Sequence, residues 1–163
     1  ARVLVEVAGY GTTCDAYRIT DEAPDGRGAM RAMRAALADA ALGPADIDYV
    51  NAHGTSTPMN DRVETAAIKA VFGPDAARLL VSSTKSMIGH TISAAGAIEL
   101  ATTVLAIRDQ MAPPTINRRV PDPECDLNYV PNAPVAAPIR AAISNSFGFG
   151  GHNDCLLVRG VAR

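Results

Sequence analysis

Short apolar runs alternate with longer alanine-rich segments through the first two-thirds of the chain. Strands are short and rich in branched residues, whereas helices are longer and favour alanine, so this alternation indicates strand followed by helix. Such chains fold into a sheet with helices on both faces. The sequence therefore predicts an α/β layered fold. Strands are expected over residues 3–7, 48–52, 79–81, 141–144 and 154–159, and helices over 28–41, 60–72 and 93–108.

Local signals set several boundaries. An alternating valine run before Gly9 and Gly11 predicts a strand that feeds a glycine-rich loop over residues 11–20. Asn60 or Asp61 is the expected cap of the second helix, with Glu64 completing a capping-box-like pattern.

The last helix and the segment after it have distinct compositions. The helix over 93–108 is apolar at most positions and is expected to be buried on most sides. Prolines mark residues 113–138 as an extended, irregular surface stretch. Cys155 is expected to begin an edge strand.

Composition excludes several classes of function. At 163 residues and 48% hydrophobic content, the chain can bury one core, so residues 1–163 are interpreted as one domain. A net charge of −2 without a Lys/Arg cluster argues against nucleic acid or an anionic membrane as partner. There is no long apolar run and no secretory pattern, which favours a soluble protein of the cytoplasm.

The cysteines and the first residue add two expectations. Cys14, Cys125 and Cys155 fit neither a CxxC pair nor a disulfide framework, which is consistent with a reducing compartment. The chain starts at Ala1 with an apolar run and no initiator methionine, which indicates a fragment or a processed chain.

Two glycine-bearing corners each carry a histidine. His53 lies beside Gly54, and His90 lies beside Gly89, each where an apolar strand is expected to end. Glycine lets other groups approach the backbone closely, and imidazole suits proton transfer or hydrogen bonding near neutral pH. A functional site is therefore expected at these corners, although either histidine alone is more often structural.

Lys85 and Glu99 strengthen the functional interpretation. Lys85 could meet His90 over a shared pocket, where a neutral imidazole donates a hydrogen bond to developing negative charge. Glu99 lies in an apolar helix, and a carboxylate there needs a partner, for which Lys85 is the obvious candidate. The alternative places Glu99 on a hydrated helix face. A zinc site from the histidines and a cysteine has no supporting ligand spacing, so no metal is expected.

The segment from Phe147 to Gly151 has two interpretations. Glycine-rich turns commonly connect two strands of a hairpin. The same residues suit a mobile loop that offers a backbone N–H to an oxyanion and an aromatic ring to gate a tunnel. His152 is most simply a loop residue.

Five motifs occur in an order that resembles the C-terminal half of a β-ketoacyl-acyl-carrier-protein synthase of the elongating, type II-like branch. The resemblance covers essentially the whole chain and implies the C-terminal half of a thiolase-like α/β/α fold. The motifs are Asp15–Thr20, Asn51–Pro58, Lys85–His90, Pro113–Asn117 and Asn145–Gly151.

The resemblance also implies roles for individual residues. His53 and His90 would bind the malonyl thioester and stabilise the enolate formed as carbon dioxide leaves, and Lys85 and Glu99 would order them. The phosphopantetheine arm would be contacted by Thr55 and Thr57. In the aromatic–glycine loop, which includes Phe147 and Gly150, Phe149 would gate the acyl pocket and its backbone N–H would help form the oxyanion hole. A second mobile loop with Asp15 and Arg18 would pack against this loop.

Further implications concern partners. The family's nucleophile is a cysteine in the other half, and the three cysteines here are interpreted as structural or incidental. The expected partners are an acyl-carrier protein, which brings the phosphopantetheine, the N-terminal half, and a second subunit in a homodimer or heterodimer. No other cofactor is expected.

Two alternative functions fit these residues less well. A non-catalytic partner subunit of the chain-length-factor type, or a dimerisation fragment, is disfavoured because His53, Lys85 and His90 are all present. A thiolase acting on coenzyme A esters would carry a second cysteine in the region where Phe149 stands.

Overall fold

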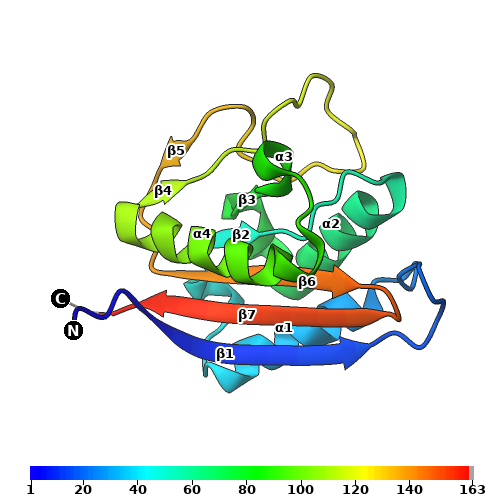
Figure 1. Ribbon diagram of the computed structural model, residues 1–163, viewed down its shortest axis with the longest axis horizontal. Helices are drawn as coiled ribbons and strands as arrows, with labels where there is room; N and C mark the ends of the chain where they lie inside the picture. Colours follow the sequence, from blue (N-terminus) through cyan, green and yellow to red (C-terminus); the bar gives the residue numbers. More distant parts are fainter. Residues whose placement is uncertain (162–163) are drawn as a thin grey trace.

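The computed structural model describes residues 1–161 and has a central five-stranded sheet. Its strands are β1 (Val5–Cys14), β2 (Tyr49–Asn51), β3 (Leu80–Ser82), β6 (Ala141–Gly148) and β7 (His152–Gly160), and a small second sheet pairs β4 (Met111–Ala112) with β5 (Val135–Ala136). The order is β1-β7-β6-β2-β3, in which β6, β2 and β3 are parallel and β7 is antiparallel to both of its neighbours (Figure 1).

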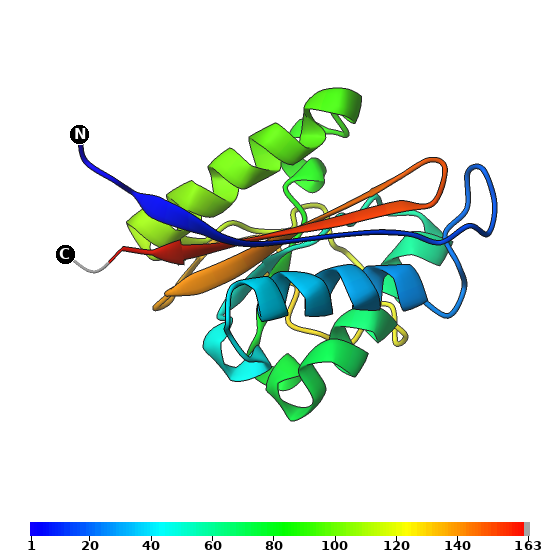
Figure 2. The ribbon, with the colours of Figure 1, turned by 90° about the horizontal axis from the view of Figure 1, so that it is seen from below.

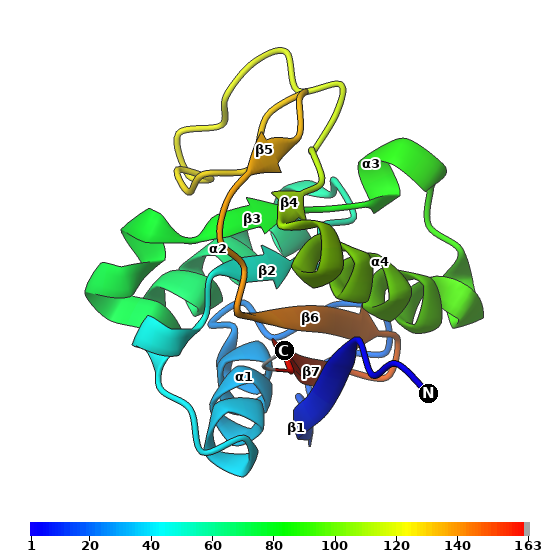
Figure 3. The same ribbon diagram turned by 90° about the vertical axis from the view of Figure 1, so that its left-hand side faces the viewer.

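Helices cover both faces of the sheet, as predicted (Figures 2 and 3). They are α1 (Arg27–Asp39), α2 (Pro58–Phe72), α3 (Lys85–Ile88) and α4 (Ala95–Asp109), with short 3₁₀ turns at Pro44–Asp46, Gly73–Arg78 and Ile92–Ala94. One core lies between the sheet and α1 and α2, and includes Met33, Ile68 and Phe72. A second core lies under α4 and includes Tyr49 and Ile107. Within residues 1–161, no helix combines the length and hydrophobicity needed to cross a bilayer.

β1 is longer than the sequence predicted. The strand continues through Gly9 and Gly11 to Cys14 instead of entering a loop at Gly11. A Cβ at Gly11 would lie 2.0 Å from the carbonyl oxygen of Ala32, and one at Gly9 would lie 2.2 Å from that of Ala36. The glycines therefore serve the close packing of α1 on the strand, and they do not mark a turn.

The predicted cap of α2 is also wrong. The N-cap is Thr57, whose hydroxyl accepts a hydrogen bond from the Asn60 N–H at 3.3 Å. Pro58 follows at the first helical position, where its missing N–H costs nothing. Glu64 does not take part in a capping box, so its carboxylate can accept hydrogen bonds from another segment.

Three further expectations need correction. α4 exposes a stripe of Ala97, Ala101 and Leu105, so it is not buried on most sides in this chain. The proline-rich stretch contains β5 and a fully buried Val130, so it is only partly irregular surface. Cys155 lies within β7, between β1 and β6, and is not on an edge strand.

Replacing Gly11 with alanine should lower the free energy of unfolding by about 1–3 kcal/mol, because the added Cβ overpacks the contact with α1. Gly43→Ala is the matched control, since the nearest atom to its added Cβ is 3.6 Å away. Urea unfolding of the two variants measures the difference. Equal stability of Gly11→Ala and wild type would contradict the packing role.

Candidate functional site

The two histidine corners meet at one edge of the sheet. β2 and β3 are parallel neighbours, so their carboxyl ends lie side by side, where α/β sheets commonly bind ligands. Ser83 Oγ donates to the Gly54 carbonyl at 2.8 Å, and a Cβ at Gly54 would lie 2.5 Å from Ser83 Cβ. The close approach of the two corners therefore requires glycine at this position, which also has a positive φ of 45°.

This approach brings His53 and His90 together. Their ring centroids are 5.5 Å apart and the rings are almost perpendicular, with an interplanar angle of 84°. The His53 side chain is buried, whereas His90 is exposed at the corner after α3. The pairing of the two predicted imidazoles is thus present in the fold.

Glu64 is a site residue that the sequence analysis missed. This buried carboxylate accepts hydrogen bonds from the backbone N–H groups of His53 at 3.0 Å and Gly54 at 2.9 Å. The Asn145 side-chain amide donates to it at 3.1 Å. Glu64 therefore fixes the backbone that carries His53. The available signal was a carboxylate among the apolar residues of α2, which the capping pattern had explained otherwise.

Lys85 and Glu99 form the expected ion pair. Lys85 Nζ donates to Glu99 Oε1, and the two side chains are only 5% and 2% exposed. The alternative of a hydrated Glu99 is therefore wrong. Lys85 is the first residue of α3, and Glu99 lies in α4. The ion pair therefore connects the segment that carries His90 to α4.

The surroundings favour neutral imidazoles. Burial, then the nearby Lys85 charge and His90, lower the pKa of His53 to about 3. Burial and Lys85 also lower the pKa of His90. His90 Nδ1 accepts a hydrogen bond from the Ile92 N–H at 3.1 Å, which leaves the ring proton on Nε2. His90 can therefore present an N–H donor to a ligand at neutral pH.

The two phenylalanines of the C-terminal motif lie in different places. Phe147, near the end of β6, lies with its ring centroid 5.4 Å from that of His53. Phe149 and Gly150 are on the hairpin turn between β6 and β7, and Phe149 is 78% exposed. The segment thus forms a hairpin turn between β6 and β7, and Phe147 is the aromatic residue that packs against His53.

The loop with Asp15 and Arg18 packs against this turn, as expected. The Asp15 N–H donates to the Gly151 carbonyl at 2.8 Å, and the buried Asp15 carboxylate accepts from the Ala23 N–H at 2.7 Å. Arg18 does not reach the turn through its side chain, which instead pairs with Asp21 at 3.1 Å. Asp15 therefore contributes to anchoring this loop through both its backbone and its side chain.

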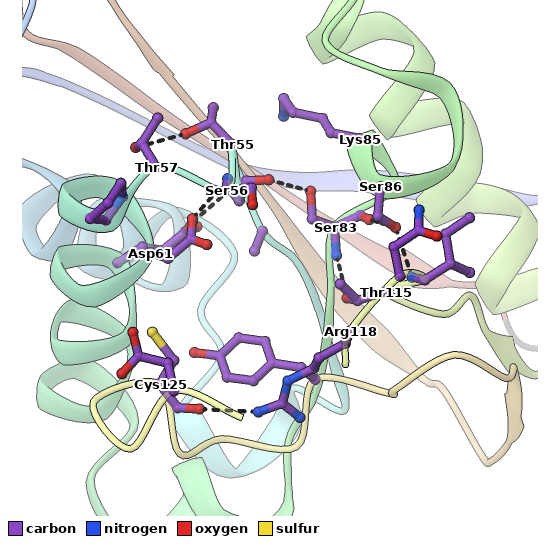
Figure 4. A pocket seen from close by; sticks show the side chains of 18 of the residues that line it. Thr55, Ser56, Thr57, Asp61, Ser83, Lys85, Ser86, Thr115, Arg118 and Cys125 are labelled. Carbon is purple, nitrogen blue, oxygen red and sulfur yellow. Dashed lines mark hydrogen bonds between the residues drawn. The ribbon is translucent and has the colours of Figure 1, made fainter. Parts of the chain in front are cut away.

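An open cleft of about 860 Å³ begins at the histidine corners. His90, Lys85, Thr55 and Thr57 line it, and the two threonine hydroxyls are 3.2 Å apart (Figure 4). Another part of the wall comes from α2, including Asp61 and Glu64. The proline-rich stretch contributes Arg118, Cys125 and Tyr129, with Arg118 stacked on the Tyr129 ring.

Two of the three cysteines lie in settings that disfavour the thiolate. Burial raises the pKa of Cys125, and that of Cys155 even further, so both thiols stay protonated near neutral pH. Cys14 is exposed and lies at the end of β1.

Comparison with known proteins identifies the family. Residues 4–119 match the model for the beta-ketoacyl synthase C-terminal domain. The chain is 56% identical over 156 residues to 3-oxoacyl-[acyl-carrier-protein] synthase 2 of Synechocystis sp., covering 96% of this chain and 38% of the relative. It is 53% identical over 159 residues to the protein of the same name from Staphylococcus aureus, covering 98% of this chain and 38% of the relative.

Solved structures show the same relationship. A ketosynthase solved with its type II PKS acyl-carrier protein and bound to the hexaketide has a TM-score of 0.97 and 42% identity, covering 99% of this chain and 40% of that chain. A beta-ketoacyl synthase from Burkholderia phymatum has a TM-score of 0.92 and 37% identity, and the match covers 99% of this chain and 39% of that chain. The expected thiolase-like α/β/α fold is confirmed, and the chain spans about two-fifths of the length of these relatives. It belongs to the beta-ketoacyl synthase family and corresponds to the family's C-terminal domain.

Proposed function

We propose that this chain supplies the histidine pair of a β-ketoacyl-acyl-carrier-protein synthase, an acyltransferase that condenses a malonyl thioester with an enzyme-bound acyl chain. The observation that carries the proposal is the contact of His53 with His90, which lines the cleft, together with the lowered pKa of both rings. The names of the similar proteins support the same activity.

The proposed reaction uses the imidazoles as hydrogen-bond donors. The bond between the malonyl carboxylate and its neighbouring carbon breaks, carbon dioxide leaves, and the electron pair forms an enolate. Neutral N–H groups of His53 and His90 stabilise the enolate oxygen. The enolate carbon then attacks the acyl thioester, a new carbon–carbon bond forms, and the cysteine thiolate leaves.

The remaining residues have supporting roles in the proposal. Lys85 and Glu99 order the pair, and burial together with the Lys85 charge keeps the rings neutral. Thr55 and Thr57 contact the phosphopantetheine arm that an acyl-carrier protein brings, and no other cofactor is assigned. Both threonines line the same cleft as His90, which supports that assignment (Figure 4).

The nucleophile and the gate complete the proposed enzyme. The nucleophilic cysteine is assigned to an N-terminal half, because Cys125 and Cys155 lie in settings that raise the thiol pKa. Phe149 is assigned as the gate of the acyl pocket, with a backbone N–H of its turn at the oxyanion. A homodimer or a heterodimer with a like subunit is the proposed assembly, and one similar solved structure is a ketosynthase/chain length factor pair.

Replacing His53 or His90 with alanine, in a full-length ketosynthase that contains this chain, should slow malonyl decarboxylation and condensation by roughly 10²- to 10³-fold, because each variant removes a donor to the enolate. Glutamine keeps an N–H donor, so His90→Gln should retain more activity than His90→Ala. Lys69→Ala is the control, since Lys69 pairs with Asp126 on the surface. Wild-type decarboxylation in both alanine variants would refute the assigned roles. Equal rates for His90→Gln and His90→Ala would refute hydrogen-bond donation.

The depressed pKa of His53 also makes stability depend on pH. The unfolded imidazole binds a proton with a pKa of 6.5, whereas the folded one does so only at about 3. Protons therefore favour the unfolded chain below pH 6.5, and the free energy of unfolding should fall by up to about 2 kcal/mol between pH 7 and pH 5. Urea unfolding at several pH values gives the free energy of unfolding of wild type and of His53→Gln. The difference between the two proteins in how steeply this free energy changes with pH measures the contribution of His53. Identical slopes would contradict a buried neutral ring.

A further inference from the structure

His152 lies close to the site but has no part in the chemistry proposed above. It is the first residue of β7, opposite Gly148 in the hairpin and opposite Cys14 of β1. Its side chain is exposed. The imidazole is therefore available to act on the hairpin turn of residues 149–151, which carries Phe149.

The ring of His152 packs against the turn at Gly150. A Cβ built on Gly150 would lie 3.3 Å from His152 Cδ2 and 3.4 Å from Nε2. Gly150 has a φ of +84°, a conformation that the absence of a side chain allows. The imidazole edge thus covers the space beside the Gly150 Cα.

The same turn is bonded to the loop of residues 15–26. The Gly150 N–H donates to the Ile19 carbonyl at 2.6 Å, and the Asp15 N–H donates to the Gly151 carbonyl at 2.8 Å. In Figures 1 and 2 the turn and the loop after β1 lie side by side at one end of the sheet. The turn is therefore bonded to the loop through its backbone, and the His152 ring lies beside it at Gly150.

We propose that His152 is a positioning residue that holds the turn of residues 149–151 against the loop of residues 15–26 and so fixes the place of Phe149. The contact is made by the ring, and the imidazole nitrogens are not required. The consequence for acyl binding rests on the proposed function, whereas the effect on the turn does not.

Amide hydrogen exchange in this chain tests the structural part. His152→Ser should speed exchange of the Gly150 and Asp15 N–H groups by about five-fold, because the turn loses the contact that opposes its opening. His152→Phe restores a ring and should keep exchange near the wild-type rate. The Val158 N–H, deep in β7, is the reference for global unfolding.

Two exchange results would overturn the proposal. Unchanged exchange at Gly150 in His152→Ser would show that the ring does not hold the turn. An equal acceleration at Val158 would show general destabilisation.

Kinetics of a full-length ketosynthase that contains this chain test the consequence. His152→Ser should raise KM for the acyl thioester several-fold with little change in malonyl decarboxylation, and His152→Phe should restore KM. A wild-type KM in His152→Ser would refute the link to Phe149. Absence of condensation by the parent enzyme would refute the proposed function, while the exchange result would still decide whether His152 holds the turn.

Discussion

The parallel pairing of β2 with β3 is the constraint on which the site depends. Asn51 lies opposite Ser82, and the next residue, Ala52, donates its N–H to the Ser82 carbonyl at 2.9 Å. β2 ends at Asn51 and β3 ends at Ser82, so the two turns that follow these strands lie next to each other. His53 follows one turn and His90 follows the short helix after the other. A shift in register would move the two rings apart and turn side chains to the opposite face.

Two buried carboxylates stabilise this arrangement. Removing a carboxylate from water is costly unless it gains partners. Glu64 gains three N–H donors, two of them from the backbone of the His53 corner. Glu99 gains the ammonium of Lys85. The first carboxylate positions His53, and the second places a cation near both rings, where it opposes their protonation. Glu64 therefore contributes to the position of His53, and Lys85 adds to the effect of burial in lowering the pKa of both rings.

The sequence predicted the features that depend on local pattern. Strand–helix alternation gave the layered fold, and an isolated charge in an apolar helix led to the pairing of Glu99 with Lys85. Features that depend on tertiary proximity were missed. Gly9 and Gly11 have the same pattern whether they form a turn or admit a helix backbone, and only the packing of α1 distinguishes the two. Glu64 had a local explanation as a capping residue, which its bonds to a distant loop overrode. The contact of Phe147 with His53 depends on how far β6 extends, which sequence pattern does not define well.

His53 and His90 are expected to be neutral hydrogen-bond donors near neutral pH. Nitrogen-15 NMR of the imidazole rings, recorded on this chain from pH 7.5 to pH 5, measures both the protonation state and the tautomer. His53 should show no imidazolium signal across this range, and His90 should carry its proton on Nε2 at neutral pH. Titration of His53 with a midpoint near 6.5, or a proton on Nδ1 of His90, would contradict this expectation.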